Sequence, residues 1–107
     1  PSAFMASELY VQMGMVRMSQ RAAFEAMEAV YCNKSGRALR RLAETALITG
    51  EDEVASKYLS ILEETLYYRH WAQESRQYLG HPERLDTHPT YGRLRDYYLY
   101  EEDRLFY

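Results

Sequence analysis

The sequence predicts an all-α fold built from antiparallel helical hairpins. Along most of the chain, apolar residues recur at the three- and four-residue spacing of one helix face. The 107 residues include only three prolines and five glycines, which argues against long loops and β-rich turns. A pattern of helix, glycine and helix also occurs twice, and aligning Gly14 with Gly50 gives an offset of 36 residues.

The clearest helix is predicted over residues 36–49. Its apolar residues follow the spacing of one helix face, and they are Leu39, Leu42, Ala43, Ala46 and Leu47. Ser35 is the expected N-cap residue. Gly50 stands where a left-handed residue is expected to end the helix.

A second helix is predicted over residues 51–66, directly after Gly50. Its apolar stripe consists of Val54, Ala55, Tyr58, Leu59, Leu62 and Leu66. The acidic residues at 51–53 suit the positive end of the helix dipole. Because the link around Gly50 is short, the two helices are expected to form an antiparallel hairpin.

The beginning of the chain predicts an earlier hairpin of the same design. Its first helix presents Met5, Ala6, Leu9, Tyr10 and Met13, and its second presents Ala22, Ala23, Ala26, Met27 and Val30. Gly14 ends the first helix, and residues 31–36 form a turn-rich linker. All five methionines lie in this hairpin, and most are expected to fill its core. Exposure of Met15 and Met18 would instead indicate a missing neighbouring repeat.

A C-terminal helix is predicted over residues 68–79, and Gly80 with His81-Pro82 ends it. The remaining residues hold a second His-Pro pair and a run of tyrosines, and they predict an irregular aromatic tail. Within this tail, Asp86 or Thr87 could cap a short helix near 90–98. The predicted organisation is a helical repeat domain at 1–80, followed by residues 81–107 as a capping tail or the start of a further segment.

The second hairpin resembles a tetratricopeptide repeat. The residues that match the family pattern are Leu39, Leu42, Ala43, Ala46, Gly50, Ala55, Tyr58 and Leu59. The sequence departs from the family at Asp52 and Tyr67, where the family has a tyrosine and a proline, and at Ser19, where the first unit should have alanine. The resemblance implies two degenerate repeats and a following helix over residues 5–79. It also implies a concave groove, lined by residues 5–13 and 36–49, in which proteins or peptides bind.

A second resemblance concerns the segments RRLAETALITG, EVASKYL and LYYRHWA. They are similar to a soluble segment of uncharacterised membrane-anchored proteins from Bacteroides-type bacteria. This similarity implies that the domain is tethered to a larger protein, and it implies no activity. Since the sequence starts at Pro1, we expect it to be a fragment of that larger protein.

Composition and charge argue against several classes of partner. The net charge of −3 does not favour nucleic acid, although residues 1–50 carry +2 and residues 51–107 carry −5. No apolar run approaches the ~20 residues of a membrane span, so direct membrane insertion of this segment is not expected. The single Cys32 excludes an intrachain disulfide.

No constellation of residues predicts catalysis, a metal or a cofactor. The three histidines are His70, His81 and His88, and their spacing matches no metal-binding motif. The adjacent glutamates at 63–64 and 101–102 would point about 100° apart on a helix, so they do not form an acid–base pair. We therefore expect that the chain is not an enzyme.

The best candidate site is a basic cluster of Lys34, Arg37, Arg40 and Arg41. Arginines one helical turn apart can hold a carboxylate through paired hydrogen bonds. The alternative is a solvated helix face on which Arg40 and Glu44 form an ordinary ion pair. The first reading predicts a protein-interaction or scaffolding module that binds an acidic partner. The second is compatible with a structural spacer within a larger, membrane-anchored protein, whose isolated domain would self-associate.

Overall fold

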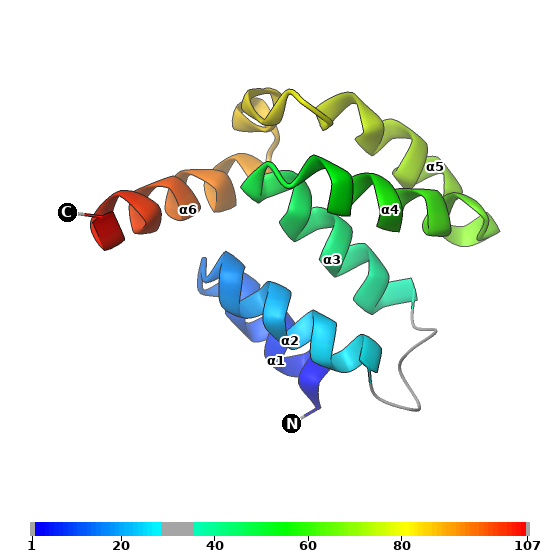
Figure 1. Cartoon of the computed structure of the whole chain (residues 1–107), viewed down its shortest axis with the longest axis horizontal. Coiled ribbons are helices and arrows are strands. Elements are labelled where there is room, and N and C mark those ends of the chain that lie inside the picture. The colour runs from blue at the N-terminus through cyan, green and yellow to red at the C-terminus, as the bar shows by residue number, and fades with distance from the viewer. Residues whose placement is uncertain (1, 29–35, 107) are drawn as a thin grey trace.

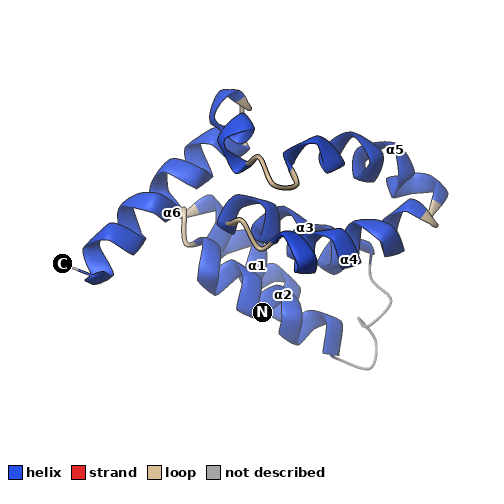
Figure 2. Cartoon of the chain, turned by 45° about the horizontal axis from the view of Figure 1, so that its top comes forward, coloured by secondary structure: helices blue, strands red, loops and turns tan. Residues whose placement is uncertain are grey.

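The computed structural model describes residues 2–28 and 36–106, with side chains described as far as Glu101. In this part of the chain all regular structure is helical, which confirms the predicted all-α class (Figures 1 and 2). The α-helices are α1 (Ala3–Gln12), α2 (Val16–Glu28), α3 (Gly36–Thr49), α4 (Asp52–Glu63), α5 (Leu66–Ser75) and α6 (Tyr91–Phe106). Two short 3-10 helices, η1 (Arg76–Tyr78) and η2 (Pro82–Thr87), lie between α5 and α6.

The two predicted glycine turns have the same conformation. Gly14 and Gly50 both have φ of 77°, a region that glycine enters without a Cβ clash. At each turn, the amide after the glycine donates to the carbonyl five residues earlier, over 2.8 Å to Tyr10 and 2.9 Å to Ala46. These short links fold α1 back against α2 and α3 back against α4.

The same offset of 36 residues relates the buried positions of the two hairpins. The equivalent pairs are Ser7 and Ala43, Ser19 and Ala55, Ala23 and Leu59, and Ala26 and Leu62, each member no more than 1 % exposed. At two of these four pairs the first hairpin has alanine where the second has leucine, and at the other two it has serine where the second has alanine. At its centre, the Ser19 hydroxyl donates to the Ser7 carbonyl over 2.8 Å, which ties α2 to α1.

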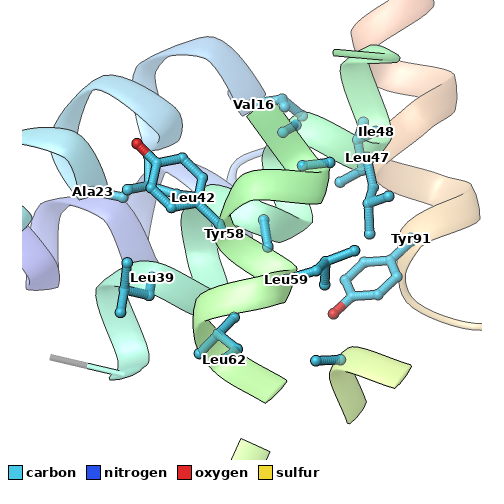
Figure 3. Packing of buried hydrophobic residues seen from close by; sticks show 14 of the residues in the cluster. Val16, Ala23, Leu39, Leu42, Leu47, Ile48, Tyr58, Leu59, Leu62 and Tyr91 are labelled. Atoms are coloured by element: carbon cyan, nitrogen blue, oxygen red, sulfur yellow. The ribbon is translucent and has the colours of Figure 1, made fainter. Parts of the chain in front are cut away.

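Helix α3 occupies the centre of the molecule. It packs against α2 on one side, against α4 on another and against α6 near its C-terminal end. Figure 3 shows its leucines and Ile48 meeting Leu59 and Leu62 of α4 and Tyr91 of α6. The predicted helix boundaries at 36–49 and the predicted buried stripe are both confirmed. Ser35, the expected N-cap residue, lies outside the described residues.

The predicted stripe of α1 is wrong. Met5, Leu9 and Met13 are more than half exposed, and the residue that α1 buries fully is Ser7. The physical reason is the close approach of α1 and α2 through Ser7 and Ser19, since small residues allow closer helix contact than methionine does. Met15 and Met18 are exposed as well, so four of the five methionines do not fill the core.

The predicted helix over residues 51–66 is interrupted. α4 ends at Glu63, and α5 begins at Leu66, two residues before its expected start. Leu66, predicted to be core, is 81 % exposed. α5 turns Ala72 and Ser75 into the interior, where both are buried. Gly80 has φ of 73° and ends this region as expected.

The tail predicted to be irregular is mostly helical. The sixteen-residue helix α6 follows the second His-Pro pair, and no proline interrupts it. Tyr91 and Leu94 lie one turn apart on its buried face and, with Leu85 of η2, join the main hydrophobic core. Arg95 adds a polar contact, since it donates to the Ile48 carbonyl at the end of α3 over 3.3 Å.

Candidate functional site

A cleft of about 780 Å³ opens along α1, α3 and α5. From α1 it is lined by Phe4, Met5, Glu8 and Val11, from α3 by Arg37, Arg40, Arg41 and Glu44, and from α5 by Tyr67, Tyr68 and Trp71. His88, Thr90 and Tyr91 complete the lining. The groove expected between residues 5–13 and 36–49 coincides with this cleft, and α5 adds an aromatic wall.

The predicted arginines have three different environments within the cleft. Arg41 is largely buried, with 12 % of its side chain exposed, whereas 40 % of the Arg40 side chain is exposed. Arg37 is exposed and makes no ion pair with any described residue. Lys34, the fourth member of the predicted cluster, lies outside the described residues.

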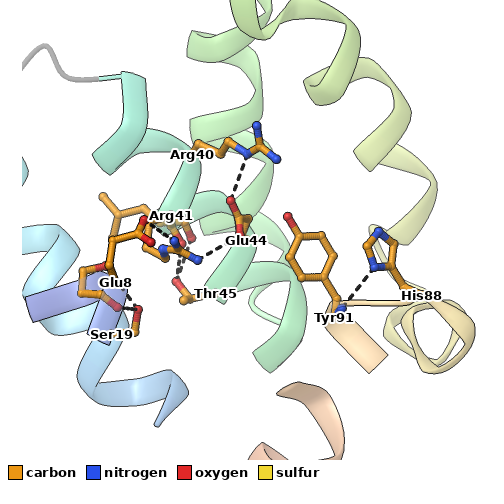
Figure 4. Close-up of polar contacts among 10 residues, drawn as sticks. Glu8, Ser19, Arg40, Arg41, Glu44, Thr45, His88 and Tyr91 are labelled. Atoms are coloured by element: carbon orange, nitrogen blue, oxygen red, sulfur yellow. Dashed lines mark hydrogen bonds and ion pairs between the residues drawn. The ribbon is translucent and has the colours of Figure 1, made fainter. Parts of the chain in front are cut away.

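Arg41 forms ion pairs within the protein. It donates to Glu8 of α1 and, over 3.2 Å, to Glu44 of its own helix (Figure 4). Its charge is therefore balanced by two carboxylates. This contact ties α1 to α3 along the floor of the cleft, so the main role of Arg41 in the structure is to hold the two helices together.

Glu44 connects two arginines. One of its carboxylate oxygens accepts from Arg40 Nε over 3.0 Å, and the other accepts from Arg41 (Figure 4). The predicted pairing of Arg40 with Glu44 is present, but the glutamate is buried and not on a solvated face. Because both arginines depend on the same buried carboxylate, Glu44 fixes their positions relative to each other.

Arg40 reaches from this buried network into the cleft. Its guanidinium lies over the ring of Trp71, 4.7 Å from the ring centre, so α3 and α5 meet through a cation–π contact. Burial opposes the charge of Arg40, but Glu44 and Tyr91 outweigh burial and raise its pKa. Arg40 therefore presents a fixed positive charge beside an aromatic surface.

The aromatic wall was not identified from the sequence as part of a binding site. Tyr67 is 83 % exposed, and its ring meets that of Tyr68 edge to face at 4.7 Å. The Tyr68 ring in turn covers Gly36 at the start of α3. A sequence pattern can place aromatic residues on one helix, but it does not tell which other helix they face.

His88 and Tyr91 line the cleft from the start of α6 and the turn before it. His88 Nδ1 accepts from the backbone amides of Thr90 and Tyr91, each over 3.1 Å, and so begins α6 (Figure 4). The two rings stack at 4.4 Å. Burial raises the pKa of the Tyr91 hydroxyl, and the charge of Glu44 adds to this effect. Asp86 and Thr87, the expected N-cap residues, do not cap α6.

Among the described residues that line it, the cleft therefore combines balanced ion pairs with one cation, Arg37, that forms no ion pair. Two arginines and two glutamates compensate one another, namely Arg40, Arg41, Glu8 and Glu44, and the exposed Arg37 adds a positive charge to the lining. This arrangement suits an anionic group that lies next to an apolar or aromatic group. No three side chains among the described residues are grouped as potential metal ligands.

Comparison with known proteins gives a family but no activity. A model of a family of unknown function, DUF6057, matches residues 1–107. The chain belongs to this family. No curated protein matches it, and no solved structure matches it. In the described part of the chain, none of the helices has the length and apolar character needed to cross a membrane.

Proposed function

We propose that this chain is a protein-interaction module that binds an acidic peptide or an acidic segment of a neighbouring domain in the cleft. Its role is binding and not catalysis. The observation that carries the proposal is the position of Arg37, an exposed arginine without an ion pair among the described residues, at a cleft lined by the alternate helices α1, α3 and α5. Arg40 stands one turn away, so the two can contact one carboxylate.

The aromatic wall suggests the second half of the ligand. Tyr67 and Trp71 offer apolar surface beside the two guanidinium groups. A peptide with an acidic residue next to an apolar or aromatic residue would use both features. In this proposal Arg37 and Arg40 contact the ligand, and Arg41 holds α1 and α3 in place without contacting it.

The repeat architecture supports the same proposal. We infer that α1–α2 and α3–α4 are two degenerate tetratricopeptide-like repeats and that α5 begins the next unit. The 36-residue offset between turns and buried positions supports this inference. In such arrays the first helix of each hairpin lines the concave surface, and α1, α3 and α5 are the helices that line the cleft.

The test uses Trp71, the single tryptophan of the chain, as a reporter inside the cleft. Peptides are selected on the wild-type domain from a random display library, and their binding is measured by Trp71 fluorescence. We expect acidic peptides to be enriched, and Arg37→Glu to weaken their binding at least ~10-fold, because a repulsive charge replaces an attractive one. Arg21→Glu is the matched control, since Arg21 is exposed on α2 outside the cleft.

Two outcomes would reject the proposal. One is selection of peptides without acidic residues, and the other is equal binding by the wild type and Arg37→Glu. Circular dichroism of both variants checks that the fold is intact. Arg41→Glu is not a suitable test, because it would place a third carboxylate beside Glu8 and Glu44 and would destabilise the domain.

The alternative function is a structural spacer within a larger, membrane-anchored protein. The exposed methionines of the first hairpin favour it, since they leave apolar surface uncovered. A spacer would bind no free peptide in the cleft, so the fluorescence titration also separates the two functions.

A further inference from the structure

The charges that line the cleft do not cancel completely. The described lining includes three arginines and two glutamates, namely Arg37, Arg40, Arg41, Glu8 and Glu44. His88 adds no charge, because its Nδ1 accepts hydrogen bonds from two backbone amides and so carries no proton. The described lining therefore has one positive charge in excess, and a single carboxylate on the ligand would balance it.

Glu8 limits the cleft to one such carboxylate. It accepts a hydrogen bond from Arg41, but 42 % of its side chain is exposed, whereas only 9 % of the Glu44 side chain is. Glu8 therefore neutralises Arg41 and also presents negative charge to a ligand in the cleft. A second anionic group on the ligand would meet this charge with no further arginine in the described lining to balance it, and like charges brought together oppose binding.

Apolar surface lies on both sides of the arginines. α3 contacts α1 through Arg41 and contacts α5 through Arg40, so it lies between these two helices along the cleft. The wall from α1 contains Phe4, Met5 and Val11, and the wall from α5 contains Tyr67, Tyr68 and Trp71. A ligand that covers both walls has apolar residues before and after its acidic residue. A C-terminal carboxylate would have apolar residues on one side only.

We infer that the cleft binds a segment with a single aspartate or glutamate between apolar residues, and that Glu8 excludes segments with a second anionic group or with a phosphate in its place. The inference rests on the proposed function and narrows its acidic ligand to a monoanionic one. Phosphoserine is the sharpest comparison, because it carries a charge of about −1.5 to −2 at pH 7 and also forms strong hydrogen bonds with arginine.

The test compares peptides that differ at one position. The reference peptide has the core Leu-Phe-Glu-Leu-Phe between flanks of glycine and serine, and both of its ends are blocked. In three further blocked peptides the glutamate is replaced by phosphoserine, by two glutamates or by glutamine. A last peptide has the glutamine core and a free carboxylate directly after it. Trp71 fluorescence at one ionic strength measures binding. We expect the reference peptide to bind at least ~5-fold more tightly than each of the others.

The variant Glu8→Gln tests the cause of this preference. It leaves two positive charges in excess, so the phosphoserine and two-glutamate peptides should gain at least ~5-fold in affinity relative to the reference peptide. Glu53→Gln is the matched control, because it removes the same charge from an exposed residue of α4 outside the cleft, and it should keep the wild-type preference. Circular dichroism checks both folds. The peptide comparison on the wild type needs no variant, so it decides the charge limit by itself.

Three outcomes would overturn the inference. The first is equal or tighter binding of the phosphoserine or two-glutamate peptide by the wild type. The second is an unchanged preference in Glu8→Gln, or a preference that Glu53→Gln abolishes as well. The third is equal binding of the peptide whose only carboxylate is C-terminal. Failure of the proposed function would look different, since the blocked glutamate and glutamine peptides would then bind equally.

Discussion

The ring of Tyr97 in α6 lies against Gly14 in the turn between α1 and α2. A Cβ added to Gly14 would lie 3.1 Å from two atoms of this ring, whereas one added to Gly50 would have no neighbour within 4 Å. The two glycines have the same φ of 77°. The same substitution at the two glycines therefore meets the same backbone strain, and the difference between them measures the contact with Tyr97 of α6.

Gly14→Ala should lower the free energy of unfolding more than Gly50→Ala. Both should cost about 1–2 kcal/mol, because alanine is strained at positive φ. Gly14→Ala should cost about 1 kcal/mol more, because it displaces Tyr97. Urea unfolding measures both values. In a Tyr97→Ala background the two substitutions should cost the same, and a persistent difference would contradict this explanation.

The buried serine pair predicts a strong coupling between α1 and α2. The hydroxyls of Ser7 and Ser19 lie 3.2 Å apart, and both residues are fully buried. Ser19→Ala should destabilise the protein by about 1–2 kcal/mol, since it leaves a buried hydroxyl unpaired. The double variant Ser7→Ala/Ser19→Ala should cost less than the sum of the single variants. Additive costs in a double-mutant cycle would rule out the coupling.

Two arginines of the same helix should respond differently to truncation. Arg41→Ala should lower the free energy of unfolding by about 2–4 kcal/mol, because it leaves the buried Glu44 with one partner fewer. Arg37→Ala should change it by less than about 0.5 kcal/mol, because Arg37 is exposed. Thermal and urea unfolding measure both. Equal effects would show that Arg41 does not hold the helices together.

The contact of Glu51 with α2 should weaken in acid. Burial alone would raise the pKa of the Glu51 carboxyl, but hydrogen bonds from Thr49 and Arg17 outweigh burial and hold the pKa below the ordinary 4.5. Because the folded pKa is lower than the unfolded one, this stabilisation is present above about pH 4.5 and is lost as the pH falls through the folded pKa.

Glu51→Gln should therefore lower the free energy of unfolding by about 0.5 kcal/mol at pH 7, a small value because solvent screens the half-exposed pair. The difference from the wild type should shrink as the pH falls below 4.5. Glu53→Gln serves as the control, since Glu53 is exposed nearby and has no hydrogen bond or ion pair among the described side chains. A pH-independent difference for Glu51→Gln would contradict the assignment.

The start of α6 leaves no space for a side chain at Gly92. A Cβ there would lie 2.6 Å from the Asp86 carbonyl oxygen, a backbone atom that cannot move alone. Gly92→Ala should therefore cost about 3 kcal/mol. At Gly36 the obstacle is the ring of Tyr68, which can rotate, so Gly36→Ala should cost less and disturb the cleft instead. Urea unfolding measures both costs, and a larger loss of stability for Gly36→Ala than for Gly92→Ala would contradict this explanation.

The sequence predicted helices best where a strong apolar pattern was bounded by glycine. The helix at Gly36–Thr49 and the turns at Gly14 and Gly50 follow from local spacing and from the φ that glycine permits. In the last part of the chain, the His-Pro pairs suggested an irregular tail. They end before Thr90, and α6 continues from there without a helix breaker.

The candidate site was predicted in part. The sequence placed Arg37, Arg40 and Arg41 on one helix, and all three line the cleft. It did not distinguish their environments, because Arg41 and Arg40 each have, besides Glu44 of their own helix, a partner on another helix. Glu8 lies 33 residues before Arg41, and Trp71 lies 31 residues after Arg40.

The sequence by itself determined the helical class and the two glycine turns, because each depends on residues that are close along the chain. Only the tertiary structure decided which face of α1 is buried, whereas the predicted face of α2, with Ala22, Ala23 and Ala26, is buried as expected. Ser7 and Ser19 are small and polar, so hydrophobic spacing favoured Met5, Leu9 and Met13 as the buried side. The close approach of two helices decided otherwise, and it left those apolar residues exposed at the end of the stack.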